Sequence, residues 1–396
     1  MKAGWRTTTL GELFDITSSK RVFESEWTSE GVPFYRAREI VKLARNGFVE
    51  NELFISEEMF DQYSTKYGIP QEGDIMVTGV GTLGICYVVQ KKDRFYFKDG
   101  NIIWLKKRTD ANSRFVEYAF QSDFLRKQID DSVGATVGTY TIIKAKSTAI
   151  PLPPASEQQR IVAILDEAFD GIATAKANAE KNLQNARELF ENCLETVLTQ
   201  KSDGWSEKKF DEICDITSRL IDPRDEQSCN LLHVGAGNIE SKTGFLSGLQ
   251  TALEENLISG KFLFDESMVL YSKIRPYLMK VARPDFSGLC SADIYPLAPN
   301  PKYIVRDYLY YLLLTPSFTE YAIQGSARAG MPKVNREHLF NLRVQLPPLE
   351  EQIPIAARLD FLRAETQHLE SLYQQKLATL AELKKSLLHE AFSGRL

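Results

Sequence analysis

The feature that most constrains this chain is an internal duplication, because a repeated segment must fold twice into the same supersecondary unit. Three pairs of segments match in the same order: Trp5–Ser18 with Trp205–Ser218 at a displacement of 200, Gly73–Thr78 with Glu266–Tyr271 at 193, and Leu152–Gln158 with Leu346–Gln352 at 194. Three matches at nearly constant displacement are hard to obtain by chance. The sequence therefore predicts two copies of one module, each a globular part followed by a helix.

The length of 396 residues suits two or three domains of roughly 150 residues each. We divide the chain into a first module at 1–154, a first spacer helix at 155–204, a second module at 205–348 and a second spacer helix at 349–396. A content of 43% hydrophobic and 26% charged residues excludes a disordered or fibrous chain. The longest apolar run, Tyr308–Leu314, is far shorter than a membrane span, and the N-terminus lacks a signal-peptide pattern, so we expect a cytoplasmic protein without a membrane partner.

Both spacer segments carry apolar residues in alternating steps of four and three, the heptad pattern of a coiled coil. The predicted seams are Ile161, Leu165, Ala168, Ile172, Ala175, Ala179, Ala186, Leu189 and Cys193, and Ile355, Leu359, Leu362, Thr366, Leu369, Tyr373, Leu380, Leu383 and Leu387. A Ser156–Gln159 capping box would start the first helix, and Pro354 suits the first turn of the second. We expect the two helices to pair antiparallel, with the modules at opposite ends of a rod of roughly 65 Å.

The globular parts have the mixed pattern of an α+β fold. Strands are predicted at 74–78, 85–89, 102–105 and 268–271, and helices at 115–128 and 304–314. The fold class expected for the whole chain is two tandem mixed α/β domains separated by two long helices that pair as an antiparallel coiled coil.

The glycine-rich motif GVGTLG at Gly79–Gly84 satisfies the G-x-G-x-x-G pattern of dinucleotide sites. A dinucleotide site requires a helix after the motif, whereas Ile85–Val89 reads as a strand. We therefore predict a glycine-rich hairpin. The second copy has SKIRPY at Ser272–Tyr277, so the loop contents change while the scaffold persists, which suits recognition better than a fixed reaction.

No catalytic or metal-binding constellation is found in the sequence. It contains no phosphate-binding GxxxxGK[ST] loop, no HExxH motif and no Asn/Asp-Pro-Pro-aromatic tetrapeptide of an amino-methyltransferase. The five cysteines are scattered without a C-x-x-C pair, and we expect buried, reduced thiols.

The charge differs between segments, with net values of +1 for residues 1–154, −1 for 205–348 and −4 for 155–204. Basic residues of both modules occur beside aromatic or hydroxyl residues in turn-like settings, where they can bind phosphates and reach base edges. For any one of these residues, an ordinary solvated surface is the alternative. The candidate DNA-binding residues are Lys20, Arg21, Tyr35, Arg36, Arg38, Thr78, Thr82, Thr136, Thr139, Tyr140, Lys144, Arg219, Lys273, Arg275, Arg328 and Lys333.

The whole pattern resembles the specificity subunit of type I restriction-modification systems. Each module opens with a Trp and a short Leu-Gly-Glu-Leu-Phe-type strand and closes with Leu-Pro-Pro-x-x-Glu-Gln before a heptad helix, and the chain ends in AFSGRL at Ala391–Leu396. The resemblance covers essentially the whole chain. Glu350 stands where the first copy has Ser156, and the recognition loops have no fixed family pattern, so individual DNA contacts are not carried over.

The resemblance implies a non-catalytic subunit whose modules each read one half of a bipartite, asymmetric site in double-stranded DNA. The helices would act as a spacer and dock two modification subunits, which bring S-adenosylmethionine and adenine methylation. Restriction subunits would add ATP- and Mg-dependent translocation and cleavage, and no cofactor is expected on this chain. Two alternatives remain: a recognition subunit whose methylase and nuclease share one partner polypeptide, and a bivalent DNA-binding regulator acting alone.

Overall fold

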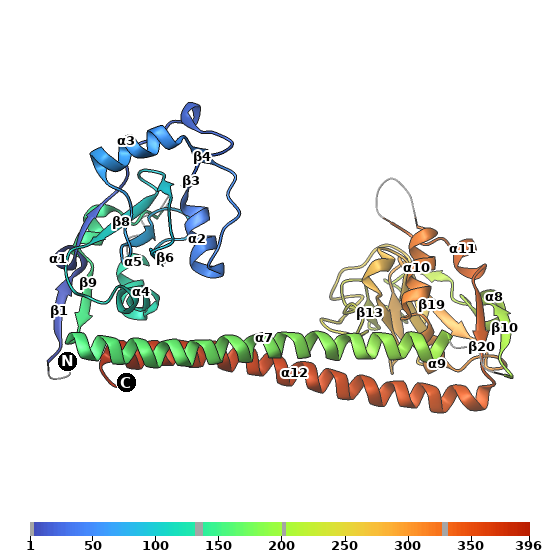
Figure 1. Cartoon of the computed structure of the whole chain (residues 1–396). Coiled ribbons are helices and arrows are strands. Elements are labelled where there is room, and N and C mark those ends of the chain that lie inside the picture. Colours follow the sequence, from blue (N-terminus) through green and yellow to red (C-terminus); the bar gives the residue numbers. More distant parts are fainter. Residues whose placement is uncertain (1–3, 131–137, 200–202, 327–331) are drawn as a thin grey trace. The chain divides into compact units, whose positions relative to one another are not determined.

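The structure is a computed structural model that describes residues 4–130, 138–199, 203–326 and 332–396 (Figure 1). The chain divides into two compact units. The first comprises Met1–Ala179 together with Lys376–Leu396, and the second comprises Glu180–Gln375. Within the described ranges, no helix combines the length and the apolar character needed to cross a membrane.

The first module is built on a four-stranded antiparallel sheet in the order β2-β8-β5-β6, with a smaller sheet β4-β3-β7 and a ribbon β1-β9. Its strands are β1 (Arg6–Thr9), β2 (Phe14–Thr17), β3 (Val32–Tyr35), β4 (Phe54–Ile55), β5 (Ile75–Thr78), β6 (Cys86–Val88), β7 (Tyr96–Phe97), β8 (Ile102–Lys107) and β9 (Ala149–Leu152). Ile75 and Val77 belong to one apolar core and Met76 to another, because successive side chains of a strand point to opposite faces. The strands predicted at 74–78, 85–89 and 102–105 are confirmed.

The helices of this module are α1 (Leu10–Leu13), η1 (Glu24–Glu26), α2 (Ala37–Asn46), α3 (Glu57–Tyr67), α4 (Ser113–Gln121), α5 (Asp123–Asp130) and α6 (Ile142–Ser147). The prediction of one helix over 115–128 was wrong, since Ser122 has an extended backbone (φ −76°, ψ 151°) between α4 and α5. The Leu-Gly-Glu-Leu segment is also not a strand. It forms one helical turn, in which Glu12 accepts a hydrogen bond from the backbone N–H of Thr9 at 3.3 Å.

The second module repeats this plan, with the sheet β11-β19-β16-β17, a five-stranded sheet β12-β15-β18-β13-β14 and a ribbon β10-β20. Its strands are β10 (Ser206–Lys209), β11 (Cys214–Asp215), β12 (Leu220–Ile221), β13 (Leu232–Val234), β14 (Gln250–Thr251), β15 (Lys261–Phe264), β16 (Val269–Ser272), β17 (Val281–Ala282), β18 (Gly288–Cys290), β19 (Ile294–Pro299) and β20 (Arg343–Leu346). Its helices are α8 (Phe210–Ile213), η2 (Pro276–Leu278), α9 (Arg306–Leu312), α10 (Pro316–Gln324) and α11 (Arg336–Phe340). The strand predicted at 268–271 is confirmed, and the helix predicted at 304–314 is shorter than expected.

Strand register shows that the two modules are structural repeats. In the ribbon that opens and closes each module, Arg6 pairs with Leu152, and Ser206 pairs with Leu346. The two pairs are related by the same displacements, 200 and 194, that the sequence repeat shows.

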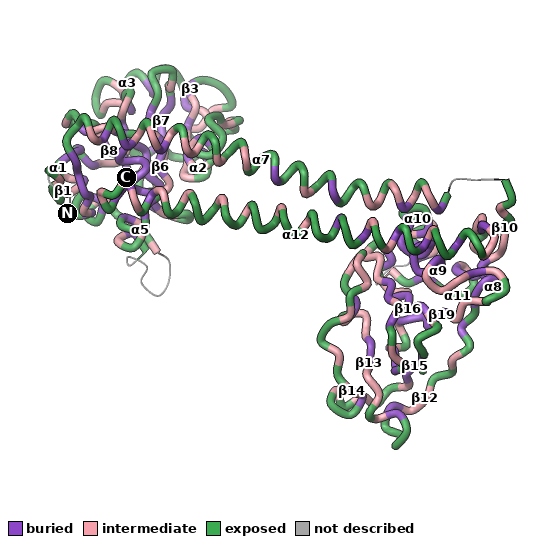
Figure 2. Tube along the Cα trace, turned by 90° about the horizontal axis from the view of Figure 1, so that it is seen from below, coloured by how far each residue is buried: buried purple, intermediate pink, exposed green. Residues whose placement is uncertain are grey.

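Two long helices, α7 (Ala155–Thr199) and α12 (Leu349–Ser393), each contribute residues to both units. The shared core residues are Ile161, Leu165, Leu388 and Phe392 in the first unit, and Leu194, Leu198, Ala356 and Leu359 in the second. The start of one helix thus packs against the end of the other in each unit, which is the predicted antiparallel pairing. Buried positions recur along α7, whereas in α12 they lie within residues 352–366 and 388–392 (Figure 2).

The predicted seam is displaced by one residue in part of each helix. Leu189 is 54% exposed, whereas Phe190 lies against Tyr311 with ring centroids 6.4 Å apart. Likewise Leu383 is 46% exposed, and the ammonium of Lys384 lies 4.9 Å from the ring of Phe169. Phe190 takes the place of Leu189 because an aromatic ring buries more area than leucine, and Lys384 takes the place of Leu383 through a cation–π contact with Phe169.

A buried glutamine joins each long helix to its module. Gln158 accepts from the N–H of Asn112 at 2.9 Å and donates to the carbonyl of Pro153 at 2.9 Å. Gln352 accepts from Val305 at 2.9 Å and donates to Pro347 at 3.0 Å. The helix begins at Ala155, so the predicted capping residue Ser156 lies inside its first turn. Pro354 lies in the second turn of α12 rather than the first, since that helix begins at Leu349.

Candidate nucleic-acid interface

Three loops of the first module are bonded to one another. Loop A (residues 36–38) follows β3 and includes the first two residues of α2, loop B (79–85) joins β5 to β6, and loop C (98–101) joins β7 to β8. The N–H of Lys98 donates to the carbonyl of Tyr35 at 2.8 Å, and the N–H of Gly79 donates to the carbonyl of Asn101 at 2.9 Å. Loop C is therefore bonded directly to loop B and to the last residue of β3, where loop A starts.

The second module forms the same three loops at 235–237, 273–280 and 291–293. The N–H of Ser291 donates to Val234 at 3.0 Å, and the N–H of Lys273 donates to Asp293 at 3.0 Å. A further bond to loop B also recurs, from Tyr140 to the carbonyl of Gly79 at 3.0 Å in the first module and from Val334 to that of Lys273 at 2.8 Å in the second. One backbone frame therefore presents the loops of both modules.

Loop B of the first module is the predicted glycine-rich hairpin, since β5 and β6 pair antiparallel. The buried Thr78 hydroxyl accepts from the N–H of Ile85 at 3.0 Å and donates to the carbonyl of Thr82, whose side chain is exposed. Arg126 donates to the carbonyl of Leu83 at 2.7 Å. The Tyr140 hydroxyl is buried and hydrogen-bonded to that of Thr148 at 2.7 Å. Thr78 and Tyr140 are thus occupied inside the module, and we assign them to the fold.

Loop A of the first module places two arginines around a buried carboxylate. Arg36 lies 3.0 Å from Glu39, and Arg38 contacts Glu39 and lies 2.7 Å from Glu52. Burial acts to raise the pKa of Glu39, but hydrogen bonds from Arg36 and Arg38 lower it below its usual value. Because the Arg38 side chain is 53% exposed, it can present donors to solvent while Glu39 orients it.

The other candidates of this module have varied settings. Arg21 forms an ion pair with Asp99 of loop C at 3.1 Å, and the N–H of the exposed Lys20 donates to the hydroxyl of Tyr96 at 3.0 Å. Tyr35 is stacked on Phe95 with centroids 4.7 Å apart. Two further candidates, Thr139 and Lys144, are exposed, and Thr136 lies outside the described residues.

Loop B of the second module gathers cations from segments far apart in sequence. The ammonium of Lys273 lies 4.8 Å from the centroid of the Tyr295 ring, and that of Lys333 lies 3.1 Å from Asp293. Burial and the neighbouring charge of Lys333 lower the pKa of Lys273. Arg275 is exposed in the same loop, and Arg328 lies outside the described residues.

Loop A of the second module has glycines where the first module has arginines. Gly235 and Gly237 correspond to Arg36 and Arg38 at a displacement of 199. Asn238 takes the place of Glu39, accepting from the N–H of Gly235 at 2.8 Å, where Glu39 accepts from the N–H of Arg36 at 3.0 Å. Arg219, the remaining candidate, is exposed just before β12.

Several residues that shape these loops were not found from the sequence: Glu39, Arg126, Asn238 and Asp293. A signal exists for Glu39 and Asn238, because each stands three residues after a loop N–H, the spacing of a capping acceptor. Arg126 and Asp293 act across 43 and 40 positions of sequence, and no local pattern marks such a contact.

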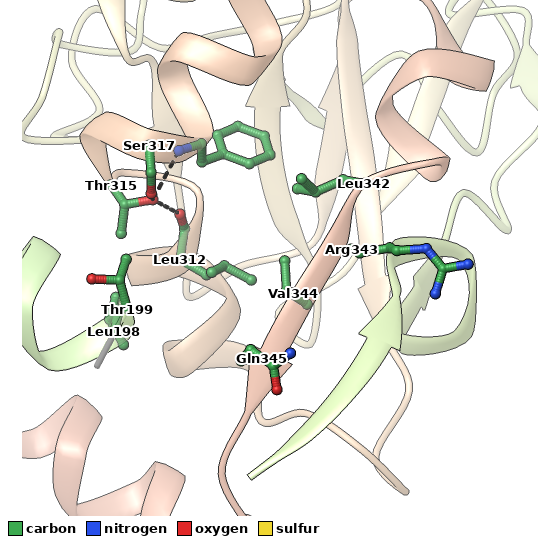
Figure 3. A pocket seen from close by; sticks show the side chains of 10 residues that line it. Leu198, Thr199, Leu312, Thr315, Ser317, Leu342, Arg343, Val344 and Gln345 are labelled. Atoms are coloured by element: carbon green, nitrogen blue, oxygen red, sulfur yellow. Dashed lines mark hydrogen bonds between the residues drawn. The ribbon is translucent and has the colours of Figure 1, made fainter. Parts of the chain in front are cut away.

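A cavity of about 210 Å³ lies away from the three loops, between the end of α7, the start of α10 and β20 (Figure 3). The Thr315 hydroxyl accepts from the N–H of Phe318 at 3.2 Å and donates to the carbonyl of Leu312 at 2.8 Å. Half of its ten lining residues are apolar, and Arg343 is the charged member. We interpret the cavity as a packing defect beside the helix junction.

Cysteine and metal chemistry add little to the site. Cys86, Cys214 and Cys290 are buried as predicted, and burial raises the pKa of the Cys86 thiol well above its usual value, while Cys193 and Cys229 are half-buried. In the part of the chain that the structure describes, no group of three His, Cys, Asp or Glu side chains could hold a metal ion.

Comparison with known proteins gives one family. A family model described as "Type I restriction modification DNA specificity domain" matches residues 2–184 and again 202–378. The type I restriction enzyme EcoDI specificity subunit of Escherichia coli is 29% identical, with 99% of this chain and 88% of that protein covered. The EcoBI specificity subunit of the same species is 21% identical, with 99% and 86% covered.

Solved structures share the fold over the whole chain. A chain from a study of complex assembly and conformational transition of the type I R-M system superposes with a TM-score of 0.78 at 20% identity, covering 100% of this chain and 99% of that one. The HsdS subunit from Thermoanaerobacter tengcongensis superposes with a TM-score of 0.63, also at 20% identity, covering 100% and 98%.

Proposed function

The chain belongs to the family of type I restriction-modification DNA specificity subunits, and from this premise we propose that each of its modules reads one half of a bipartite, asymmetric site in double-stranded DNA. The observation that carries the proposal is the pair of loop sets built on one backbone frame. Base readout depends on which donors and acceptors a side chain offers. A frame that holds Gly79–Gly84 in one module and Lys273–Arg275 in the other would therefore read two different half-sites.

We further propose that the subunit itself performs no chemistry and binds no cofactor. Two modification subunits would bring S-adenosylmethionine and methylate adenine, and restriction subunits would bring the ATP- and Mg-dependent reactions. The relatives matched over most of their length are specificity subunits of restriction enzymes, which supports this division of labour. The complex would act on DNA in the cytoplasm.

The long helices are the proposed docking surface for the modification subunits. In the second unit, α12 leaves Ile353, Phe361 and Leu372 exposed at 61%, 68% and 45%. Large apolar side chains on a solvent-facing helix are typical of a surface covered in a complex. The helices would also act as a spacer, so lengthening both by one turn should lengthen the unread gap between half-sites.

The test exchanges one module. Residues 1–154 are replaced by the equivalent module of another specificity subunit, the protein is purified with its modification subunits, and methylated adenines are mapped on unmethylated genomic DNA. We expect one half-site to change and the other to stay. A change in both half-sites contradicts the assignment of one module to each half. Methylation by the chain without modification subunits contradicts the non-catalytic role.

A partner that carries methylase and nuclease on one polypeptide would give the same module-exchange result but a different subunit composition. A chain that remains monomeric and binds DNA tightly without partners would instead favour a regulator acting alone.

A further inference from the structure

Backbone conformation singles out Arg275 in loop B of the second module. Among the described residues, four non-glycine residues have positive φ: Lys242, Asn256, Arg275 and Met279. Arg275 has φ 50° and ψ 60°, a left-handed conformation that a residue with a Cβ adopts at a cost and glycine adopts freely. Strain of this kind persists where the surrounding structure imposes it, and it is concentrated at functional sites.

The first module shows that the shared backbone, and not the arginine, imposes the left-handed conformation. The backbone bonds of loop B align Gly79 with Lys273, which corrects the displacement of 193 predicted from the sequence to 194. Gly81 is therefore the equivalent of Arg275, and it has φ +69°. The same loop position is therefore left-handed in both modules. The second module carries an arginine there although glycine suits the backbone better, so the side chain must supply something that the fold does not need.

The surroundings hold the Arg275 backbone and leave its side chain available. Its N–H donates to the carbonyl of Pro332 at 2.9 Å, and its carbonyl accepts from the N–H of Leu278 at 2.9 Å. The residue is exposed, and within the described part of the chain no hydrogen bond or ion pair engages its guanidinium. Nearby arginines differ in this respect, because Arg283 binds Asp307 at 2.9 Å and Arg336 binds Asp215 at 2.8 Å.

The neighbours of Arg275 provide charge for a polyanion. Burial lowers the pKa of Lys273, and Lys333 lies close enough for its charge to lower it further. Asp293 pairs with Lys333. Ammonium groups act as point charges suited to phosphates, whereas a planar guanidinium matches the O6 and N7 acceptors of guanine in the major groove.

We infer that Arg275 is the specificity-determining residue of the second module and reads a guanine in its half-site, with Lys273 and Lys333 binding the adjacent phosphates. The inference rests on the proposed function. The first module has Gly81 at this position, so its half-site is read by other residues.

The experiment uses the full chain in complex with its modification subunits and unmethylated genomic DNA as the probe, followed by sequencing of methylated adenines. In Arg275→Gly, which copies the first module, we expect the preference for guanine at one position of one half-site to fall on the order of 10- to 100-fold. The midpoint of thermal unfolding should be unchanged or higher, because glycine relieves the backbone strain. Arg275→Lys should retain part of the preference.

Lys242→Gly is the control, since it also removes one cation from a left-handed residue (φ 65°) of the second module, here one outside the three loops whose ammonium pairs with Glu191. Its methylation motif should equal that of the wild type. An unchanged motif in Arg275→Gly, or uniformly weaker methylation of an unchanged motif, would overturn the inference. Failure of the proposed function looks different, because the wild-type complex would then not produce a bipartite motif at all.

Discussion

The two modules carry their cations on different loops of the same frame. In the first, Arg36 and Arg38 lie in loop A and glycines fill loop B, while in the second Gly235 and Gly237 lie in loop A and Lys273 and Arg275 in loop B. The backbone bonds between loops persist through this exchange. The comparison teaches that main-chain hydrogen bonds fix where the loops lie, so their side chains are free to vary.

A charged cluster beneath each module shows a similar exchange. The hydroxyl of Tyr118 donates to Asp166 of α7, and that of Tyr311 donates to Asp360 of α12 at 2.6 Å. The cation comes from α4 in the first module, where Arg114 lies 3.1 Å from Asp166. In the second module Asp307 occupies that position, and Arg283 supplies the charge from beyond β17.

The largest expected loss of stability comes from removing Gln158 or Gln352, the two buried glutamines that join the long helices to their modules, and it tests whether their roles are equivalent. Gln352 makes one more bond than Gln158, donating also to the carbonyl of Tyr303 at 2.8 Å. Removing a buried amide leaves its partners unpaired, so Gln352→Ala should lower the free energy of unfolding by about 2–4 kcal/mol and Gln158→Ala by about 1–3 kcal/mol. Urea denaturation measures both losses, and hydrogen exchange of the backbone amides assigns each loss to its unit.

The exposed neighbour Gln159 provides the control, and Gln159→Ala should change stability by less than about 0.5 kcal/mol. Alanine has the higher helix propensity, so a loss as large as that of Gln158→Ala would show that the effect does not depend on the buried amide and would remove the glutamines from the comparison.

A smaller loss of stability is expected in the charged clusters around Asp166 and Asp360, and it should differ between the two. The Arg283 side chain is 26% exposed and that of Arg114 is 49% exposed. An ion pair contributes less to stability the more it is exposed to solvent. Arg283→Ala should therefore lower the free energy of unfolding by about 1–2 kcal/mol, and Arg114→Ala, in the more exposed cluster, by about 0.5–1 kcal/mol. Thermal or urea unfolding of the two variants at one ionic strength gives the ranking, and the reverse order would contradict it.

The pH dependence of the Arg283 variant has a defined sign. Burial acts to raise the pKa of Asp360, but hydrogen bonds from Arg283 and Tyr311 lower it below its usual value. A carboxyl group with a lowered folded pKa stabilises the protein above its unfolded pKa of about 3.9, and this stability is lost as the pH falls through the folded value. The deficit of Arg283→Ala should therefore be full near neutral pH and shrink below about pH 4, as unfolding measured from pH 7 to pH 3 would show.

The loop exchange itself can be tested by transplantation. The triple variant Arg36→Gly, Arg38→Gly, Glu39→Asn gives loop A of the first module the residues of loop A of the second. These include the asparagine that accepts a hydrogen bond from the first N–H of the loop. We expect little loss of stability and a relaxed first half-site, with preference reduced on the order of 10-fold and the second half-site unchanged. Methylation mapping with modification subunits measures this, and a change in the second half-site would break the assignment.

The smallest effect concerns phosphate binding. Lys333→Ala should reduce the slope of the logarithm of the DNA binding constant against the logarithm of salt concentration by about 1, without changing the motif. Lys302→Ala, an exposed lysine outside the three loops, is the control and should leave the slope unchanged. Equal slopes for both variants would remove Lys333 from the interface.

The sequence predicts the parts of this protein that repeat or follow a period. The duplication, the paired long helices and the glycine hairpin are all visible in residue spacing. The heptad period does not show which of two neighbouring apolar residues packs against the partner, so the packing of Phe190 instead of Leu189 was missed. It also carries no information on contacts such as that between Arg126 and Leu83, which form only after distant segments meet.

The division of the long helices between units sets an order for folding on the ribosome. The first unit is discontinuous, and its core includes Leu388, Ala391 and Phe392 from the far end of the chain. The 217 residues between Ala179 and Leu396 take roughly 10–40 s to synthesise at about 5–20 residues per second. The second unit is a continuous stretch, so it can complete its core first, and the module translated first finishes folding last.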